Sequence, residues 1–114
     1  MGLITNSMRL QQLSDARHDV ERDIQEITNA KLENSKDQAE LADQIAAASM
    51  GGEKNPEVKR LEAIKLEIEL MEKKLDAKMA RCNSRLQSIQ TETESAKKIQ
   101  EYEIQSSFTY GGGR

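Results

Sequence analysis

His18 is the only histidine of the chain, and Asp15, Asp19 and Glu21 stand close to it in a highly charged segment. A histidine with a carboxylate three or four positions away on a helix can form a weak surface metal site. One histidine does not supply a ligand set, however, and a solvated charged helix face explains the same residues. We therefore expect no metal site and no bound cofactor.

Two pairs of glutamates, Glu67 with Glu69 and Glu92 with Glu94, are the other candidates for acid–base chemistry. Their members are two positions apart, and such positions do not face each other on a helix. The sequence contains no glycine-rich loop between a strand and a helix, and no nucleophile paired with a base. It predicts no catalytic residue and a protein that is not an enzyme.

Cys82 is the only cysteine, so an internal disulfide is excluded. It falls on the apolar stripe of the second predicted helix, where a cysteine commonly behaves as a small buried hydrophobe. We favour that interpretation over a redox or crosslinking role.

The chain has one strong interruption, the segment from Met50 to Pro56. Gly51 and Gly52 can adopt the left-handed conformation that ends a helix, Asn55 can cap the next helix, and Pro56 suits its first position. The predicted elements are a helix over about 5–49, a turn over 50–55, a helix over about 56–106 and a flexible tail over 107–114.

Composition supports a fold without a globular core. Charged residues make up 32% of the 114 residues, and the aromatic residues are only Tyr102, Phe108 and Tyr110. Such a composition with helical periodicity is typical of coiled coils. We predict an all-α, antiparallel two-helix coiled-coil hairpin that associates into a larger bundle. The net charge of −3 and the lack of a long apolar run argue against a nucleic-acid partner and a membrane span.

The first helix carries apolar residues at alternating steps of three and four, which is the pattern of a coiled-coil seam. The predicted seam residues are Leu10, Leu13, Arg17, Val20, Ile24, Ile27, Lys31, Asn34, Gln38, Leu41, Ile45 and Ala48. The polar middle of this seam either fixes the pairing register or weakens the contact there. Alternatively, the helix rotates slightly and uses Leu32, Ser35 and Ala39 instead.

The second helix has a comparable seam. We expect its heptad pattern to be interrupted at Met71, Leu75 and Met79, which follow one another at two successive steps of four residues. The predicted seam residues are Leu61, Ile64, Ile68, Met71, Leu75, Met79, Cys82, Leu86, Ile89, Thr93 and Ala96. Antiparallel pairing about the turn places Ile45 opposite Leu61 and Ile27 opposite Met79.

A second apolar row runs beside that seam and widens the apolar face beyond what one partner helix covers. It consists of Ala63, Leu66, Leu70 and Ala77, and we predict that it mediates self-association. Near the end of the chain, Tyr102, Phe108 and Tyr110 form a candidate docking segment, because exposed aromatic side chains are favoured anchors at interfaces.

Two stretches resemble known proteins. Met1-Gly2-Leu3 with Ser7 and Arg9, and the closing segment from Ile99 to Phe108, resemble the ends of short uncharacterised bacterial coiled-coil proteins that open MGL-x-x-S or a close variant of it. Asn55-Pro56 and the same closing segment are more loosely similar to type III secretion needle subunits, which are small helical hairpins. The second resemblance implies export without a cleavable signal peptide.

Together these features predict a non-enzymatic structural or protein–protein interaction subunit whose partner is a second copy or another coiled-coil protein. The alternative is a coiled-coil chaperone or stalk component of a bacterial secretion or motor apparatus. The expected location is the cytoplasm, or outside it after export without a cleavable signal.

Overall fold

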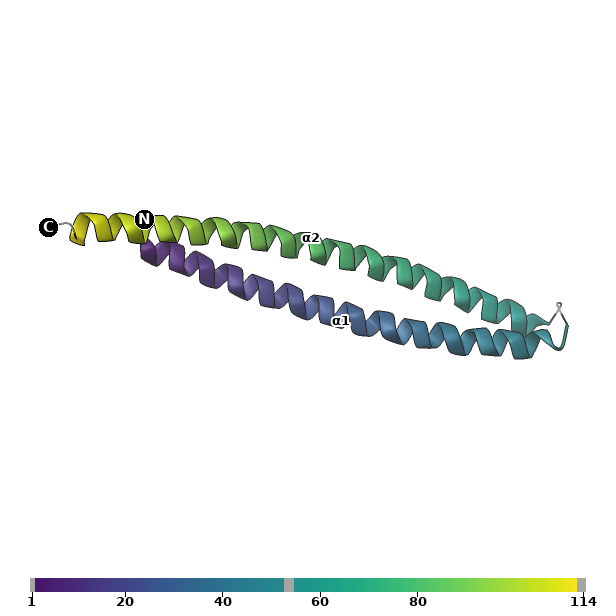
Figure 1. Cartoon of the computed structure of the whole chain (residues 1–114). Coiled ribbons are helices and arrows are strands. Elements are labelled where there is room, and N and C mark those ends of the chain that lie inside the picture. The colour runs from purple at the N-terminus through teal and green to yellow at the C-terminus, as the bar shows by residue number, and fades with distance from the viewer. Residues whose placement is uncertain (1, 53–54, 113–114) are drawn as a thin grey trace. The chain divides into compact units, whose positions relative to one another are not determined.

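The protein consists of two long helices that form an antiparallel hairpin, as the sequence predicts (Figure 1). The computed structural model describes residues 2–52 and 55–112, except for the side chains of Leu3 and residues 107–112. Helix α1 spans Leu3–Ser49 and helix α2 spans Pro56–Gly112. No strand occurs within the described ranges.

The predicted turn residues end one helix and begin the next. The amide of Gly52 donates to the carbonyl of Ser49, and Gly52 has a φ of 107°, which a side chain would strain. Asn55 caps α2, because its Oδ1 accepts a hydrogen bond of 3.0 Å from the amide of Glu57. Pro56 is the first residue of α2, where its missing N–H costs nothing. Residues 53–54 of the predicted turn lie outside the described residues.

The chain divides into two compact units, each of which pairs a stretch of α1 with a stretch of α2. We call Met1–Asp23 with Cys82–Arg114 the terminal unit, and Ile24–Arg81 the turn unit. In both units the two stretches run in opposite directions, as expected for a helical hairpin (Figure 1).

Helix α1 keeps a regular heptad pattern of buried and half-buried residues that is interrupted at Arg17, and the predicted seam is confirmed at its other positions. Arg17 is exposed, because its guanidinium reaches Glu21 over 3.3 Å instead of entering the interior. The seam also begins earlier than predicted, since Asn6, seven positions before Leu13, is buried. The buried and half-buried seam residues are Asn6, Leu10, Leu13, Val20, Ile24, Ile27, Lys31, Asn34, Gln38, Leu41, Ile45 and Ala48.

The alternative in which α1 rotates away from its polar middle is wrong. Leu32, Ser35 and Ala39 are all exposed, whereas Asn34 is buried. The polar residues therefore occupy the seam, and the heptad pattern overrides the preference for apolar side chains at this point.

Helix α2 departs from the predicted seam at two residues. Met71 is 50% exposed and Ile64 is 37% exposed, whereas Glu72 is half-buried. The seam continues from Ile68 through Glu72 to Leu75, so the predicted stutter is absent from the described part of α2. A regular heptad keeps the seam facing its partner helix even where it brings a glutamate into the contact. Val58, three positions before Leu61, is buried and begins this seam.

Helix α2 continues through Gly112, beyond the predicted end of the second helix at about residue 106. Each residue added to an existing helix gains one backbone hydrogen bond, and no proline follows Pro56 to interrupt the helix. Likewise, α1 begins at Leu3, slightly before the predicted start.

Candidate interaction surfaces

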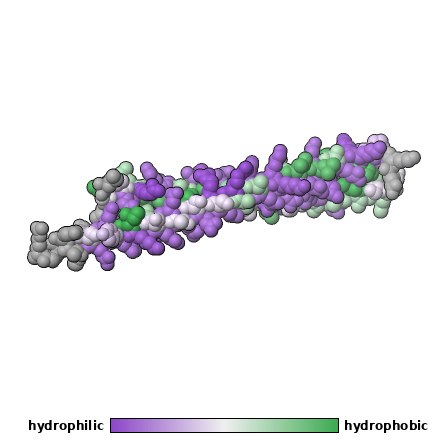
Figure 2. All heavy atoms as spheres, turned by 90° about the horizontal axis from the view of Figure 1, so that it is seen from above, coloured by the Kyte–Doolittle hydropathy of each residue, from purple (hydrophilic) through white to green (hydrophobic). Residues whose placement is uncertain are grey.

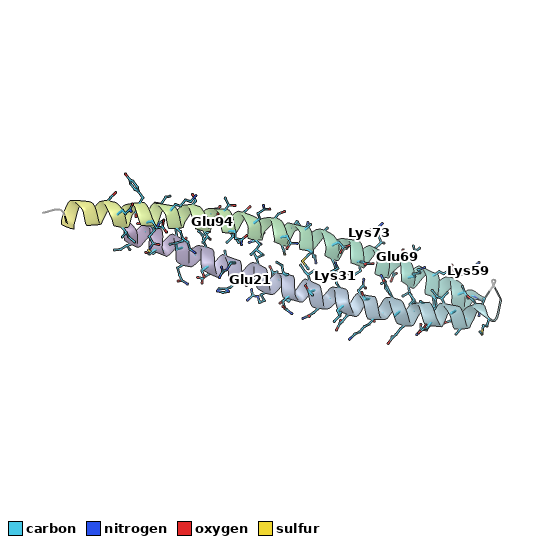
Figure 3. All side chains as sticks on the ribbon, in the orientation of Figure 1. Glu21, Lys31, Lys59, Glu69, Lys73 and Glu94 are labelled. Carbon is cyan, nitrogen blue, oxygen red and sulfur yellow. The ribbon has the colours of Figure 1, made fainter. Side chains whose placement is uncertain are left out.

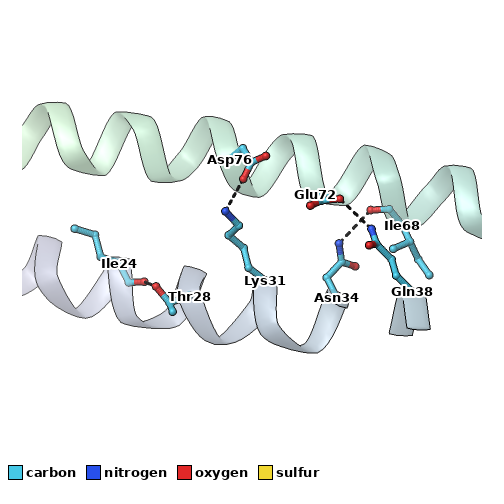
Figure 4. Close-up of polar contacts among 8 residues, drawn as sticks. All are labelled: Ile24, Thr28, Lys31, Asn34, Gln38, Ile68, Glu72 and Asp76. Atoms are coloured by element: carbon cyan, nitrogen blue, oxygen red, sulfur yellow. Dashed lines mark hydrogen bonds and ion pairs between the residues drawn. The ribbon is translucent and has the colours of Figure 1, made fainter. Parts of the chain in front are cut away.

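Three polar side chains of α1 in the turn unit reach across to α2 (Figure 4). The Lys31 Nζ donates to the Asp76 Oδ1 over 2.7 Å, and the Gln38 Nε2 donates to the Glu72 Oε2 over 2.9 Å. Between them, the Asn34 Nδ2 donates to the carbonyl oxygen of Ile68 over 3.2 Å. Each polar residue that the seam brings into the contact therefore has a partner on the opposite helix.

These contacts limit the cost of polar residues in the seam. A buried amide without a partner would cost free energy, and the hydrogen bond from Asn34 offsets that cost. Asp76 raises the pKa of the Lys31 ammonium above its ordinary value, first through the hydrogen bond and then through its negative charge. The polar middle thus tolerates burial and favours one pairing register, because each donor needs its particular acceptor.

The terminal unit has a polar contact of the same kind. The buried Asn6 donates through Nδ2 to the carbonyl oxygen of Ala96 over 2.8 Å. Nearby, Arg9 pairs with Glu92 over 3.4 Å, and both side chains are about half exposed. Asn6 and Asn34 occupy equivalent heptad positions four heptads apart. Each unit therefore contains a buried asparagine that donates a hydrogen bond to a backbone carbonyl of the opposite helix. The repeat of asparagine at this spacing was the signal that could have revealed it.

The residues considered for chemistry lie apart on exposed helix faces. His18 is exposed, and the neighbouring Asp19 accepts a hydrogen bond of 3.5 Å from Arg22 on its own helix. Glu67 and Glu69 are also exposed, and Glu92 is engaged with Arg9. Across residues 2–52 and 55–112, no group of three or more potential metal ligands is found. Cys82 is a free, half-buried thiol on the seam.

The row predicted to mediate self-association lies on the outside of α2 in the turn unit. Leu66 is 62% exposed and Leu70 is 59% exposed, and Ala63 and Ala77 are exposed beside them. Lys73 belongs to the same outer side of the helix (Figure 3). On the face shown in Figure 2, apolar side chains gather toward the turn. We refer to Ala63, Leu66, Leu70 and Ala77 as the outer row.

A groove of about 480 Å³ runs between the two helices of the turn unit. Helix α1 contributes an apolar wall made of Leu41, Ala42, Ile45 and Ala46, with Gln38 at its end. Helix α2 contributes a charged wall made of Lys65, Glu69 and Glu72. This groove was not predicted from the sequence. The residue that could have indicated the groove is Lys65. It occupies a seam position of α2, seven residues before Glu72, but its side chain is exposed.

The candidate docking segment is only partly described. Tyr102 is exposed on α2 and has exposed apolar neighbours in Ile99 and Ile104. The side chains of Phe108 and Tyr110 lie outside the described residues.

Neither α1 nor α2 contains, within the described residues, an apolar stretch long enough to cross a membrane. Comparisons of the chain with protein-family models, with curated proteins and with solved structures find no match.

Proposed function

We propose that this protein is a non-enzymatic structural subunit, a helical hairpin that associates with further copies of itself through the outer row. The observation that carries the proposal is the exposure of Leu66 and Leu70 on one side of α2. Coiled-coil seams within a chain leave their outer faces polar when no further partner is present. Two leucines one helical turn apart on such a face are typical of a helix that packs against another helix.

The charged and polar surroundings support an interface of moderate size. Lys73 and Glu69 flank the outer row, and interfaces commonly combine an apolar centre with a polar rim. The catalytic alternative receives no support from the described side chains, because His18 and the paired glutamates lie on open, exposed surfaces.

Sedimentation equilibrium of the full chain over a range of concentrations tests this proposal. We expect a mass above the 12.8 kDa of one chain, and we expect Leu66→Glu with Leu70→Glu to return it to that value. Circular dichroism should show the helix content unchanged, because both residues lie outside the seam. Met8→Glu is a matched control, since Met8 is 61% exposed in the terminal unit and should leave the mass unaffected. A wild-type chain that is monomeric at every concentration would contradict the proposal.

A second candidate function is a coiled-coil chaperone or stalk component of a bacterial secretion or motor apparatus. The exposure of Tyr102, with the exposed Ile99 three positions before it on the same side of α2, favours it, because such a pair can anchor a partner. The protein would then act in the cytoplasm, or outside it after export without a cleavable signal. If this second function holds, Tyr102→Ser should abolish capture of the partner protein. Both proposals expect this change to leave self-association unaffected.

A further inference from the structure

We infer that the outer row packs against the outer row of a second copy in parallel, so that the two α2 helices run in the same direction and equal residues face each other. This inference depends on the proposed function and adds the orientation and the register of the contact. A two-fold axis parallel to α2 then relates the two copies, and both contribute the same surface.

The outer row has the spacing of a coiled-coil seam. Ala63, Leu66 and Leu70 follow one another at steps of three and four, and Ala77 stands one heptad after Leu70. All four side chains are exposed, so no described residue of the same chain covers them. In a parallel pair in register, Leu66 packs on Leu66 and Leu70 on Leu70 of the second copy, which removes the leucine side chains from water.

Exposed charged residues flank the outer row on both sides, at intervals of seven residues. The acidic flank consists of Glu62, Glu69 and Asp76, and the mixed flank consists of Arg60, Glu67, Lys74 and Arg81. These flanks correspond to the g and e positions beside a heptad seam. In two parallel helices in register, a residue of the acidic flank therefore faces the residue five positions later in the mixed flank of the second copy.

Parallel pairing opposes unlike charges over most of the row. Glu69 faces Lys74 of the second copy, and Asp76 faces Arg81 of the second copy. The two-fold axis repeats both pairs. Asp76 also binds Lys31 of its own chain over 2.7 Å, but its side chain remains 55% exposed and accessible to a second cation.

Two like-charged contacts remain in this arrangement. Glu62 faces Glu67 of the second copy at the end of the row nearest the turn. Lys73, which follows Leu70 in the row, faces its own counterpart. Because Glu69 and Asp76 stand four positions before and three positions after Lys73 on the same helix, acidic side chains surround both ammonium groups.

Antiparallel pairing of the two outer rows is much less favourable. The antiparallel register that joins the leucines places the acidic flank of one copy against the acidic flank of the other, with Glu69 opposite Glu69. In the mixed flank, Glu67 lies opposite Glu67, and Arg60 lies opposite Lys74. Like charges across an interface suppress this arrangement, so the charges select the parallel orientation.

Disulfide exchange between two single-cysteine chains tests the orientation. Both chains carry Cys82→Ser; one carries Ala63→Cys, the other carries Ala77→Cys, and a tag makes their masses different. Parallel pairing places each new thiol against its counterpart, whereas Ala63 of one copy and Ala77 of the other stand two heptads apart, about 21 Å along the helix. A disulfide requires Cα atoms within about 7 Å. In a glutathione redox buffer, we therefore expect each homodisulfide to exceed the mixed disulfide about tenfold.

The matched control is Ala47→Cys, again with Cys82→Ser. Ala47 is an exposed alanine of the same unit, but it lies on α1, which is outside the proposed contact. This chain should form about tenfold less homodisulfide than the chain with Ala63→Cys.

The outcomes separate this inference from the proposed function. A mixed disulfide in excess of both homodisulfides would overturn the parallel orientation and leave the outer row as the interface, because antiparallel pairing brings Ala63 of one copy near Ala77 of the other. Homodisulfides at the level of the control, from a wild-type chain that sediments as an oligomer, would overturn the contact between outer rows and leave self-association standing. A monomeric wild-type chain would overturn both.

A charge reversal distinguishes the two orientations on chains without new cysteines. Lys74→Glu should weaken dimerisation about tenfold in sedimentation equilibrium, because glutamates then oppose each other at both symmetric positions. Adding Glu69→Lys should restore the wild-type dissociation constant. Lys36→Glu makes the same charge change at an exposed position of α1 and should have no effect. Tighter association of Lys74→Glu would overturn the inference, because antiparallel pairing places this position opposite Arg60.

Discussion

Asn34 donates a hydrogen bond from its side-chain amide to the backbone carbonyl of Ile68, on the opposite helix, over 3.2 Å. The amide is buried at a seam position that Leu13, Val20, Ile27 and Leu41 occupy in other heptads. A polar residue at such a position commonly sacrifices stability in return for a defined register.

We predict that Asn34→Leu stabilises the hairpin. The leucine removes a buried polar group, and the Ile68 carbonyl lies within α2, where the helix itself supplies a donor. The gain should be about 1 kcal/mol, seen as a rise of a few degrees in melting temperature by circular dichroism. Asn34→Ala, which removes the hydrogen bond without adding apolar volume, is the control and should lower the melting temperature. If Asn34→Leu also lowers it, the hydrogen bond itself stabilises the fold.

We predict that Leu75→Glu and Met71→Glu, one helical turn apart, have very different effects. Leu75 is buried in the seam, so a glutamate there should cost about 3 kcal/mol and largely unfold the turn unit. Met71 is half exposed, so the same change should leave the melting temperature within a few degrees of the wild type. Equal losses would show that Met71 belongs to the seam after all.

The contrast between these residues also indicates how far the sequence could predict the fold. The heptads of α1 are regular and mostly apolar, so nearly all of its seam followed from periodicity. In α2 the prediction preferred Met71 to Glu72, because methionine is the more apolar residue. The spacing of the whole helix determines which side faces the partner, and one polar residue does not change it.

The groove and its charges could not be predicted in the same way. Recognising them requires the level at which residues of α1 face α2, and that level is fixed by cross-helix contacts such as Gln38 with Glu72. The outer row, in contrast, was readable from sequence because Leu66 and Leu70 lie on one helix at helical spacing.

The turn provides a matched pair of glycine substitutions. Gly52 has a positive φ, so Gly52→Ala should strain the backbone and destabilise the hairpin by about 1 kcal/mol. A Cβ at Gly51 would meet the Ala48 carbonyl oxygen and the Asn55 Nδ2 at ordinary contact distances of 3.4 Å. Gly51→Ala should therefore be neutral or slightly stabilising. Chemical unfolding in urea measures both, and the reverse order would contradict the assigned turn conformation.

The Lys31–Asp76 ion pair should show coupling in a double-mutant cycle at low salt. Lys31→Asp and Asp76→Lys should each lower the melting temperature, and the double exchange should recover part of the loss, because it restores opposite charges. High salt should reduce the coupling, since both side chains are partly exposed. Independent, additive losses would show that the pair contributes nothing.

The same pair sets a direction for the dependence on pH. Asp76 raises the pKa of Lys31 in the folded chain, so its contribution to stability is fully present below the ordinary lysine pKa. This contribution to stability is lost as the pH rises through the higher pKa that Lys31 has in the folded chain. Melting temperatures from neutral to strongly alkaline pH should therefore fall less for Lys31→Met than for the wild type. An equal fall would indicate that Lys31 does not titrate differently on folding.

The most direct test of the account is the distance between Asp23 and Arg85 within one chain, because every proposal assumes that the helices of a single chain pair antiparallel. Spin labels would be placed at these positions in a Cys82→Ser background and diluted with excess unlabelled chain, which removes distances between copies. Packed helices have axes about 8–10 Å apart, so we predict an interspin distance below about 25 Å in double electron–electron resonance. A diluted sample that has lost every short distance would contradict the hairpin and show that the helices pair only between molecules.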